Sequence, residues 1–290
     1  MNAAPLPAHA CDCHVHVVAP QASYPMLVDR HYTPGPASVE HLLAHQARLG
    51  LAHAIIVQPS IYGTDNRLLV DSLRALDGAA RGVAVLDAEV SDAELVRLHD
   101  AGVRGVRVNL ESVGASNAEA VSQALSAWAG RLAGQPWHIQ IYASLDAIAL
   151  AAPALRRLPV PVVLDHFAMI PAQVPLQDAR VAQVLSLVAS GAAYVKLSAA
   201  YRITADPAGA GQAAQVTALA QAIVACNPER ALWASDWPHT NREPGKQATE
   251  VSAYRPIAAR QLRHELDDWL PDPSLRQQVL AMNPAALYGF

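Results

Sequence analysis

Cysteine, charge and long apolar stretches are all scarce in this 290-residue sequence. Three cysteines cannot build the disulfide framework of a small secreted domain, so we expect free thiols in a reducing compartment. No apolar run reaches the roughly 20 residues that a membrane-spanning helix needs. The first ten residues also lack the basic start and apolar stretch of a secretion signal. We therefore expect a cytoplasmic protein without a membrane segment.

The charge balance excludes further classes of partner. Charged residues make up 16% of the chain and the formal net charge is −4, so there is no basic footprint for nucleic acid or an anionic membrane surface. Small molecules are the expected partners, and the oligomeric state is not predicted. The 52% of apolar residues supply a large core and argue against disorder.

One local pattern could suggest structural zinc. Cys11, Cys13 and His14 lie close together, but no second Cys/His pair follows at the spacing of a zinc finger. We expect Cys11 and Cys13 to be buried thiols in a strand.

Short runs rich in β-branched residues recur along the whole chain. Several are apolar at successive positions, which favours parallel strands that are buried on both faces. Eight such strands are expected: Cys11–Val17, His53–Gln58, Gly82–Asp87, Gly105–Leu110, His138–Ala143, Val162–Phe167, Ala193–Ala199 and Ala231–Trp237.

Segments with helical spacing alternate with these strands, and several open with Ser, Asp or Asn caps. They include Val39–Leu49, Ala93–Ala101, Ala118–Leu132, Asp146–Arg157 and Ala179–Ala189, and a last helix ends the chain at Asn283–Phe290. The alternation predicts an α/β fold, an eight-stranded parallel (β/α)8 TIM barrel that forms one domain over residues 1–290.

Two connections are longer than the usual two to six residues. Ala19–Pro36 follows the first strand and Thr240–Tyr254 follows the eighth. Both should lie at the carboxyl rim of the barrel, where barrel enzymes carry their active sites.

Ionisable residues cluster where the expected strands end. His14 and His16 are two positions apart, so the period of a strand directs both imidazoles into the barrel mouth. His166 ends the sixth strand and Asp236 the eighth. A single histidine at a strand end is often structural, but four such groups on strands that converge at one mouth predict a catalytic site.

Other polar residues near strand ends have structural alternatives. Asp165 precedes His166 and should point the other way, in a capping or orienting role. Arg104 is out of phase with Arg107 and should face helices or solvent. Lys196 could reach inward or extend from the barrel end towards water. Asp12 and His239 are expected to have supporting or structural roles.

Several motifs together resemble one family. They are Asp12-Cys13-His14-Val15-His16, Gln58-Pro59-Ser60, Gly63-Thr64-Asp65-Asn66, Gly102-Val103-Arg104-Gly105-Val106-Arg107-Val108-Asn109, Asp165-His166, Lys196-Leu197-Ser198, Tyr201-Arg202 and Ser235-Asp236-Trp237-Pro238-His239. Over nearly its whole length the chain is similar to the amidohydrolase superfamily, in particular to its branch of 2-pyrone-4,6-dicarboxylate lactonases.

This resemblance implies hydrolysis of an ester bond within a ring. Asp236 would be the general base that activates water, and His14, His16 and His166 would surround and polarise the carbonyl group. The resemblance also implies a set of groups that bind the substrate's carboxylate and ring oxygens, namely Arg107, Arg202, Tyr142, Ser60 and Thr64. A small anionic lactone is the expected substrate.

The chain departs from the family pattern at two positions. Arginines of the pyrone lactonases are replaced here by Val113 and Met169. A doubly charged pyrone would then leave a carboxylate buried without a partner, which is costly. We expect a singly charged or sugar-derived lactone, with Val113 and Met169 lining an apolar part of the pocket.

The metal requirement and the reaction class have alternatives. The fifth strand lacks the ligand of metal-bearing family members, so no cofactor is expected to be required, although His14, His16 and Asp236 could hold zinc or manganese. Two other functions stay open. One is a metal-dependent decarboxylase or hydratase of the same superfamily, and the other is a barrel that binds a ligand without catalysis.

Overall fold

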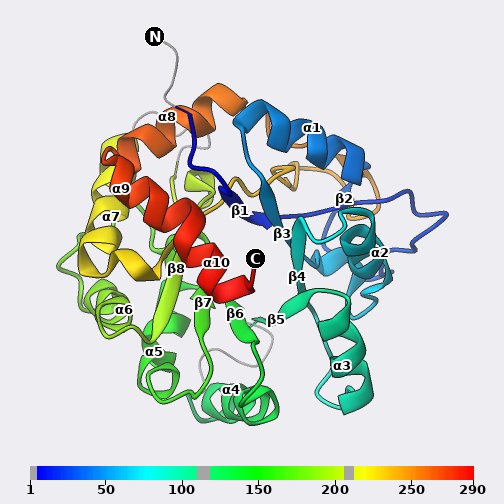
Figure 1. Ribbon diagram of the computed structural model, residues 1–290, viewed down its shortest axis with the longest axis horizontal. Helices are drawn as coiled ribbons and strands as arrows, with labels where there is room; N and C mark the ends of the chain where they lie inside the picture. The colour runs from blue at the N-terminus through cyan, green and yellow to red at the C-terminus, as the bar shows by residue number, and fades with distance from the viewer. Residues whose placement is uncertain (1–4, 110–117, 206–211) are drawn as a thin grey trace.

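Eight parallel strands form a nearly closed barrel in the computed structural model, which describes residues 5–109, 118–205 and 212–290 (Figure 1). Each strand pairs with the next, and Val15 bridges back to Trp237 beyond the last strand. In pairing order the strands are β1 (Cys11–Val15), β3 (His53–Val57), β4 (Ala80–Ala84), β5 (Val103–Asn109), β6 (His138–Tyr142), β7 (Val162–Leu164), β8 (Ala193–Leu197) and β9 (Ala231–Trp233). The predicted TIM barrel is confirmed.

Helices surround the strands (Figure 1). Side-chain oxygens of Ser38, Ser91, Ser144 and Asp178 accept backbone N–H groups where four of the helices begin, as the caps predict. In the described part of the chain the helices are α1 (Val39–Leu49), α2 (Arg67–Ala75), α3 (Asp92–Asp100), α4 (Ala118–Leu132), α5 (Leu145–Leu155), α6 (Ala179–Ala189), α7 (Ala213–Cys226), α8 (Ala259–Trp269), α9 (Pro273–Gln277) and α10 (Asn283–Tyr288). None of them is long and apolar enough to cross a membrane.

Two hydrophobic layers hold the barrel together. Residues at alternate strand positions, such as Ala54 and Ile56, pack with the helices in the larger outer cluster. The positions between them fill the barrel with Cys11, Cys13, Ile55, Val57, Val83, Val163, Leu232 and Ala234, and Tyr288 of α10 joins this inner cluster. Cys11 and Cys13 are buried free thiols, as predicted.

The expected strands extend too far at their carboxyl ends. β1 ends at Val15, β7 at Leu164 and β9 at Trp233, whereas the sequence suggested Val17, Phe167 and Trp237. Backbone hydrogen bonds between neighbouring segments continue past these ends, since the N–H of Asp165 donates to the carbonyl of Ile141 and that of Asp236 to the carbonyl of His14. His166 (φ 49°) and Asp236 (φ 60°) have left-handed backbones that strands do not contain. The left-handed turn at His166 brings into the barrel mouth a side chain that alternation would direct outward with Leu164.

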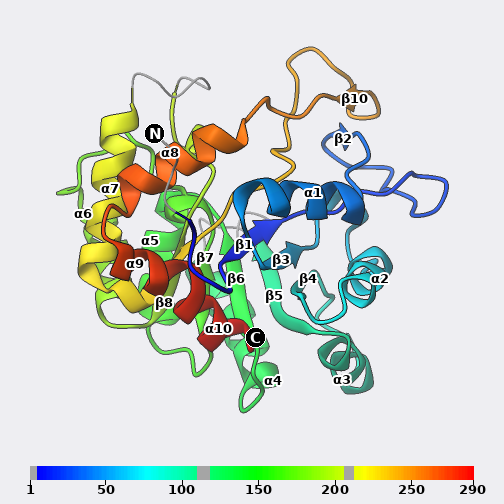
Figure 2. The same ribbon diagram turned by 45° about the horizontal axis from the view of Figure 1, so that its top comes forward.

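The two long connections meet at one end of the barrel, as predicted. Thr33–Pro34 (β2) of the first connection pairs in parallel with Val251–Ser252 (β10) of the second. The Thr33 hydroxyl also donates to the carbonyl of Ala248 at 2.7 Å. Figure 2 shows this pair standing clear of the barrel strands. The pairing brings segments more than 200 residues apart in sequence together above the mouth.

A buried histidine at the start of β6 makes the stability of the protein depend on pH. His138 is fully buried, and Gly105 makes room for it, since a Cβ at Gly105 would lie 2.3 Å from the imidazole. Burial, with the nearby charge of Lys196, lowers the pKa of His138 to about 3. Below pH 6.5 His138 is therefore protonated in the unfolded chain but not in the folded protein. Its contribution lowers the free energy of unfolding as the pH falls from 6.5 to about 3.

We expect His138→Leu to reduce this dependence. Between pH 7 and pH 5, the unfolding free energy of the variant should fall by about 2 kcal/mol less than that of the wild type. Urea denaturation of both proteins at the two pH values measures the difference. If the unfolding free energies of the two proteins changed equally, the pKa of His138 would not be lowered in the folded protein.

Candidate active site

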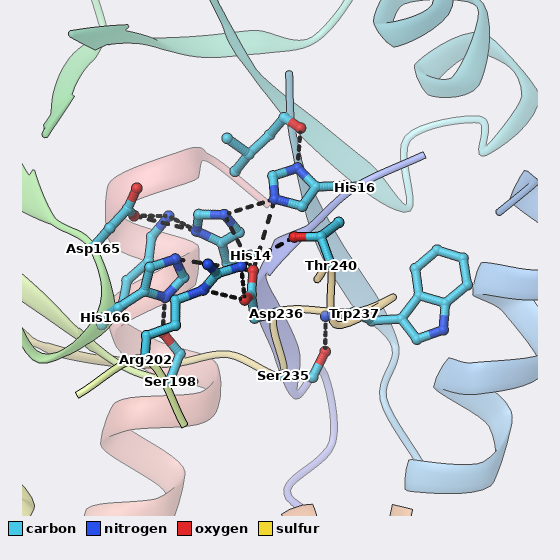
Figure 3. A network of polar contacts seen from close by, with 12 residues as sticks. His14, His16, Asp165, His166, Ser198, Arg202, Ser235, Asp236, Trp237 and Thr240 are labelled. Carbon is cyan, nitrogen blue, oxygen red and sulfur yellow. Dashed lines mark hydrogen bonds and ion pairs between the residues drawn. The ribbon is translucent and has the colours of Figure 1, made fainter. Parts of the chain in front are cut away.

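The four residues predicted to be catalytic lie together in the barrel mouth (Figure 3). The Nε2 atoms of His14 and His16 are 3.3 Å apart. Asp236 Oδ1 lies 3.8 Å from Nε2 of His14, 3.7 Å from that of His16 and 3.9 Å from that of His166. This oxygen is buried and accepts no hydrogen bond from any residue that the structure describes. Three imidazoles thus converge on one carboxylate oxygen that is left available for a ligand or a water molecule.

Unusual backbone conformations aim two of these side chains. Four consecutive residues from His166 to Met169 have φ between 49° and 55°, and Asp236 has φ 60°. Residues other than glycine rarely adopt this left-handed region, and each costs of order 1–3 kcal/mol. The surrounding barrel must hold these turns in place. Such strain is typical of residues fixed for binding or catalysis.

The remaining nitrogen of each imidazole is held by a neighbour. His16 Nδ1 donates to the carbonyl of Val57 at 2.7 Å, and His166 Nδ1 lies 2.8 Å from the hydroxyl of Ser198. His14 Nδ1 lies 3.2 Å from Asp165 Oδ1 and 3.2 Å from Lys196 Nζ. Such partners fix the orientation of each ring.

Two expectations are corrected or resolved by these contacts. Asp165 does not point away from the site, because it is in phase with Val163, which fills the barrel interior, and its N–H still donates to the carbonyl of Ile141. An orienting role for it agrees with its contact to His14. Lys196 reaches inward and is fully buried. Arg104 faces away as expected, with Nη1 donating to the carbonyls of His99 and Val103.

The second oxygen of Asp236 is occupied. Tyr201 donates its hydroxyl to Oδ2 at 2.6 Å, and Arg202 donates Nε at 2.8 Å. Burial would raise the pKa of Asp236, but Arg202 and the surrounding histidines hold it well below its usual range. Burial lowers the pKa of His16 and of His166 to about 4. At neutral pH the site therefore combines an ionised carboxylate with neutral imidazoles.

A network behind β9 supports the Asp236 turn. The backbone N–H of Ser235 donates to Asp12 Oδ1 at 2.9 Å, and the N–H of Trp237 donates to the Ser235 hydroxyl at 3.0 Å. The N–H of His239 donates to the carbonyl of Asp236 at 2.8 Å. These contacts agree with the supporting roles expected of Asp12 and His239.

A cavity of about 730 Å³ opens above the histidines. Its described lining includes Arg107, Tyr142, Ser60 and Arg202, four of the five residues predicted to bind substrate. Arg107 lies over the Tyr142 ring, 5.2 Å from its centroid. Among the described residues of this lining, the charged side chains are two arginines, accompanied by histidines, and none is a carboxylate. The cavity is therefore suited to an anion.

Three predicted residues are not placed in this cavity. Thr64 is exposed and outside the lining. Met169 packs against the hydrophobic core instead of lining the pocket, because the left-handed turn redirects it, so that expectation is wrong. Val113 lies outside the described residues. Arg202 does line the cavity, but its guanidinium is paired with Asp236, which the sequence did not suggest.

The lining also contains residues that were not predicted. Tyr32 and Leu27 come from the long connection after β1, Thr240 comes from the one after β9, and Trp128 comes from α4. The length of the two connections was the signal for their position at the rim. It could not identify which of their side chains turn inward.

The convergent atoms also suit a divalent cation. His14, His166 and Asp236 each offer a ligand atom, and these atoms lie within 4.8 Å of one another. The ligands of a tetrahedral zinc ion, bound at about 2.0 Å, lie about 3.3 Å apart. The Asp236 oxygen without a hydrogen bond could serve as a ligand of the cation, so the residues present fit such an ion. This triad contains His166 in place of the His16 expected from the sequence.

Comparisons with known proteins match nearly the whole chain. A family model described as amidohydrolase matches residues 11–290. The 2-pyrone-4,6-dicarboxylate hydrolase of Comamonas testosteroni is 33% identical, over 98% of this chain and 91% of its own length. The 4-sulfomuconolactone hydrolase of Rhizobium radiobacter is 28% identical over the same shares. A crystal structure from Acinetobacter baumannii, assigned as a 2-pyrone-4,6-dicarboxylic acid hydrolase, superposes with a TM-score of 0.80 at 23% identity, covering 97% of this chain and 100% of the other.

Proposed function

Because this chain belongs to the amidohydrolase family, we propose that it is a hydrolase that opens a carboxylate-bearing lactone ring with water activated by Asp236. The observation that carries this proposal is the Asp236 oxygen without a hydrogen bond, which faces three imidazoles below a cavity lined by arginine. The two similar proteins named as lactone hydrolases support the same reaction class.

The two oxygens of Asp236 have different roles in this reaction. Tyr201 and Arg202 hold Oδ2, so the carboxylate cannot rotate freely, and Oδ1 is directed at the attacking water. The low pKa of Asp236 makes it a weak base but keeps it ionised, so its contribution comes from position rather than basicity. The water oxygen attacks the lactone carbonyl carbon while its proton passes to Oδ1.

His166 serves the oxygen of the carbonyl group. If the Ser198 hydroxyl donates to Nδ1 of His166, its Nε2–H points into the site and can stabilise the negative charge that develops on that oxygen. When the tetrahedral intermediate collapses, the ring C–O bond breaks and the leaving oxygen takes the proton from Asp236. The new carboxylic acid then loses the second proton of the water molecule to solvent, so the product carries one more carboxylate than the substrate and the enzyme regains its starting state.

We propose a lactone with a single negative charge as the substrate. Arg202 Nη2 lies 2.8 Å from Asp236, whereas Arg107 Nη2 lies 3.6 Å from Asp165, so Arg107 is the less tightly paired cavity arginine and the better placed to bind a substrate carboxylate. Leu86 and Trp128 add an apolar part to the lining. Binding a second carboxylate would require another cation to offset its desolvation.

We propose that hydrolysis does not require a metal ion. A zinc or manganese ion held by His14, His166 and Asp236 would polarise a carbonyl group and lower the pKa of a bound water when present. The fit of this triad is also the observation that favours the second candidate, a metal-dependent decarboxylase or hydratase. In that case removal of metal would abolish turnover.

The test is a panel of lactones given to protein dialysed against a strong chelator, with proton release as the readout and bound metal measured in parallel. We expect singly charged lactones to be hydrolysed at full rate without metal. Arg107→Gln should raise their KM by about 10–100-fold, because a charge-assisted hydrogen bond is lost, and should leave neutral lactones unaffected. Arg180→Gln, which alters an exposed arginine, is the matched control. Activity restored only by added metal would select the second candidate, and hydrolysis of no lactone would refute the first.

A further inference from the structure

Lys196 is the most unusual charged residue of the barrel. The chain has two lysines, Lys196 and Lys246. Lys246 belongs to the long connection after β9 and is partly exposed. Lys196 is completely buried in β8, directly behind His14. A buried ammonium group is costly unless its donors are satisfied, so its partners carry information about the site.

Three acceptors surround this ammonium group. Lys196 Nζ lies 2.6 Å from Gln140 Oε1, 3.2 Å from Asp165 Oδ1 and 3.2 Å from His14 Nδ1. A lysine ammonium has three N–H donors and no acceptor. All three donors are satisfied only if His14 Nδ1 presents a lone pair. Asp165 Oδ1 then lies 3.2 Å from an unprotonated His14 Nδ1, and Lys196 lies between the two acceptors and donates to both. Asp165 remains satisfied, because Gln140 Nε2 donates to its other oxygen at 3.0 Å.

This assignment also explains the short contact between the two histidines of β1. The carbonyl of Val57 requires a proton on Nδ1 of His16, so a neutral His16 has a lone pair on Nε2. With Nδ1 unprotonated, neutral His14 has its proton on Nε2 and donates it to His16 across 3.3 Å. If Asp165 held the Nδ1 proton of His14 instead, two lone pairs would face each other at this distance. A cation between them would then be needed.

We propose that Lys196 fixes His14 as the tautomer protonated on Nε2 and thereby keeps the site from binding a metal ion tightly. Coordination by Nε2 requires its lone pair, so an ion must expel the proton and break the contact between Lys196 and His14. The positive charge of Lys196 behind the ring adds electrostatic repulsion. Lys196 is a positioning residue that acts through His14. The inference rests on the metal-independent hydrolysis proposed above.

Replacing Lys196 with methionine tests this role. In Lys196→Met, Asp165 can accept the Nδ1 proton of His14, and the Nε2 lone pair then faces the site. We expect zinc to bind about 10–100-fold more tightly than to the wild type, the range typical of changes to groups that hold metal ligands. Lys246→Met, the same substitution at the other lysine, should leave zinc affinity unchanged. The measurement is competition of the metal-free proteins with a chelator of known affinity, without substrate. It therefore gives a result even if the protein hydrolyses no lactone.

A second measurement uses the wild type and does not depend on the stability of the variant. Two-bond ¹H–¹⁵N correlation spectra of histidine side chains distinguish the two tautomers, and His14→Phe identifies the signals of His14. In the metal-free protein we expect Nδ1 of His14 without a proton and Nε2 with one. A proton on Nδ1 would overturn the inference. So would unchanged or weaker zinc binding in a folded Lys196→Met protein.

Discussion

Asp236→Asn is expected to lower kcat by about 10³-fold, because the asparagine side chain has nearly the same shape but cannot accept a proton from water. The substitution suits the site, since asparagine tolerates the left-handed backbone that residue 236 adopts (φ 60°). The asparagine carbonyl can still accept from Tyr201 and Arg202. Because Arg202 loses its ionic partner, we expect KM for an anionic lactone to stay the same or fall. Steady-state kinetics on the metal-free protein separates these two effects.

A matched substitution shows whether the loss is specific to the base. Asp178 also pairs with an arginine, with Arg180 Nη2 at 2.7 Å, but at the surface. Asp178→Asn should therefore keep wild-type kinetics, and circular dichroism should show that both variants are folded. Turnover by Asp236→Asn within ten-fold of the wild type would exclude Asp236 as the general base.

The barrel could be predicted because its signal is repeated along the chain. Runs such as Ala54-Ile55-Ile56-Val57 are buried on both faces, so their apolar character survives at every position, and both residues 55 and 57 fill the interior. The convergence of His14, His16, His166 and Asp236 then follows from topology, since the carboxyl ends of parallel strands meet at one rim. Their proximity is confirmed, and their catalytic roles stay predictions.

The finer features of the site depend on backbone turns that a periodic pattern does not contain. Alternation placed Asp165 away from His166, but Asp165 is in phase with the interior residue Val163, and the left-handed backbone at His166 brings this next side chain into the same site. Cys13 and His14 are neighbours that both reach the interior side, and the pairing of β1 shifts register between Asp12 and Val15. The pairing of Arg202 with Asp236 could likewise not be predicted from the sequence pattern. It depends on the three-dimensional position of a short turn after β8.

The buried charges behind His14 make a second large effect measurable, on stability. Burial would raise the pKa of Asp165, yet the charge of Lys196 holds it well below its usual range, so the ionised form is strongly favoured. Asp165→Leu would leave Lys196 buried without its anion. Removing one partner of a buried pair costs about 3–5 kcal/mol, so we expect the unfolding free energy to fall by that amount. Urea denaturation at pH 7 measures it.

The double variant identifies the origin of that loss. Replacing a buried ion pair with apolar residues is often close to neutral, so Asp165→Leu combined with Lys196→Met should recover most of the stability. Asp71→Leu is the control, because the pair of Asp71 with Arg74 is exposed and should contribute about 1 kcal/mol or less. If the double variant were as unstable as Asp165→Leu alone, the loss would come from the packing of residue 165. Recovery of stability in the double variant would instead show that the loss comes from the uncompensated charge of Lys196. This result is expected if Lys196 and Asp165 act together to hold His14.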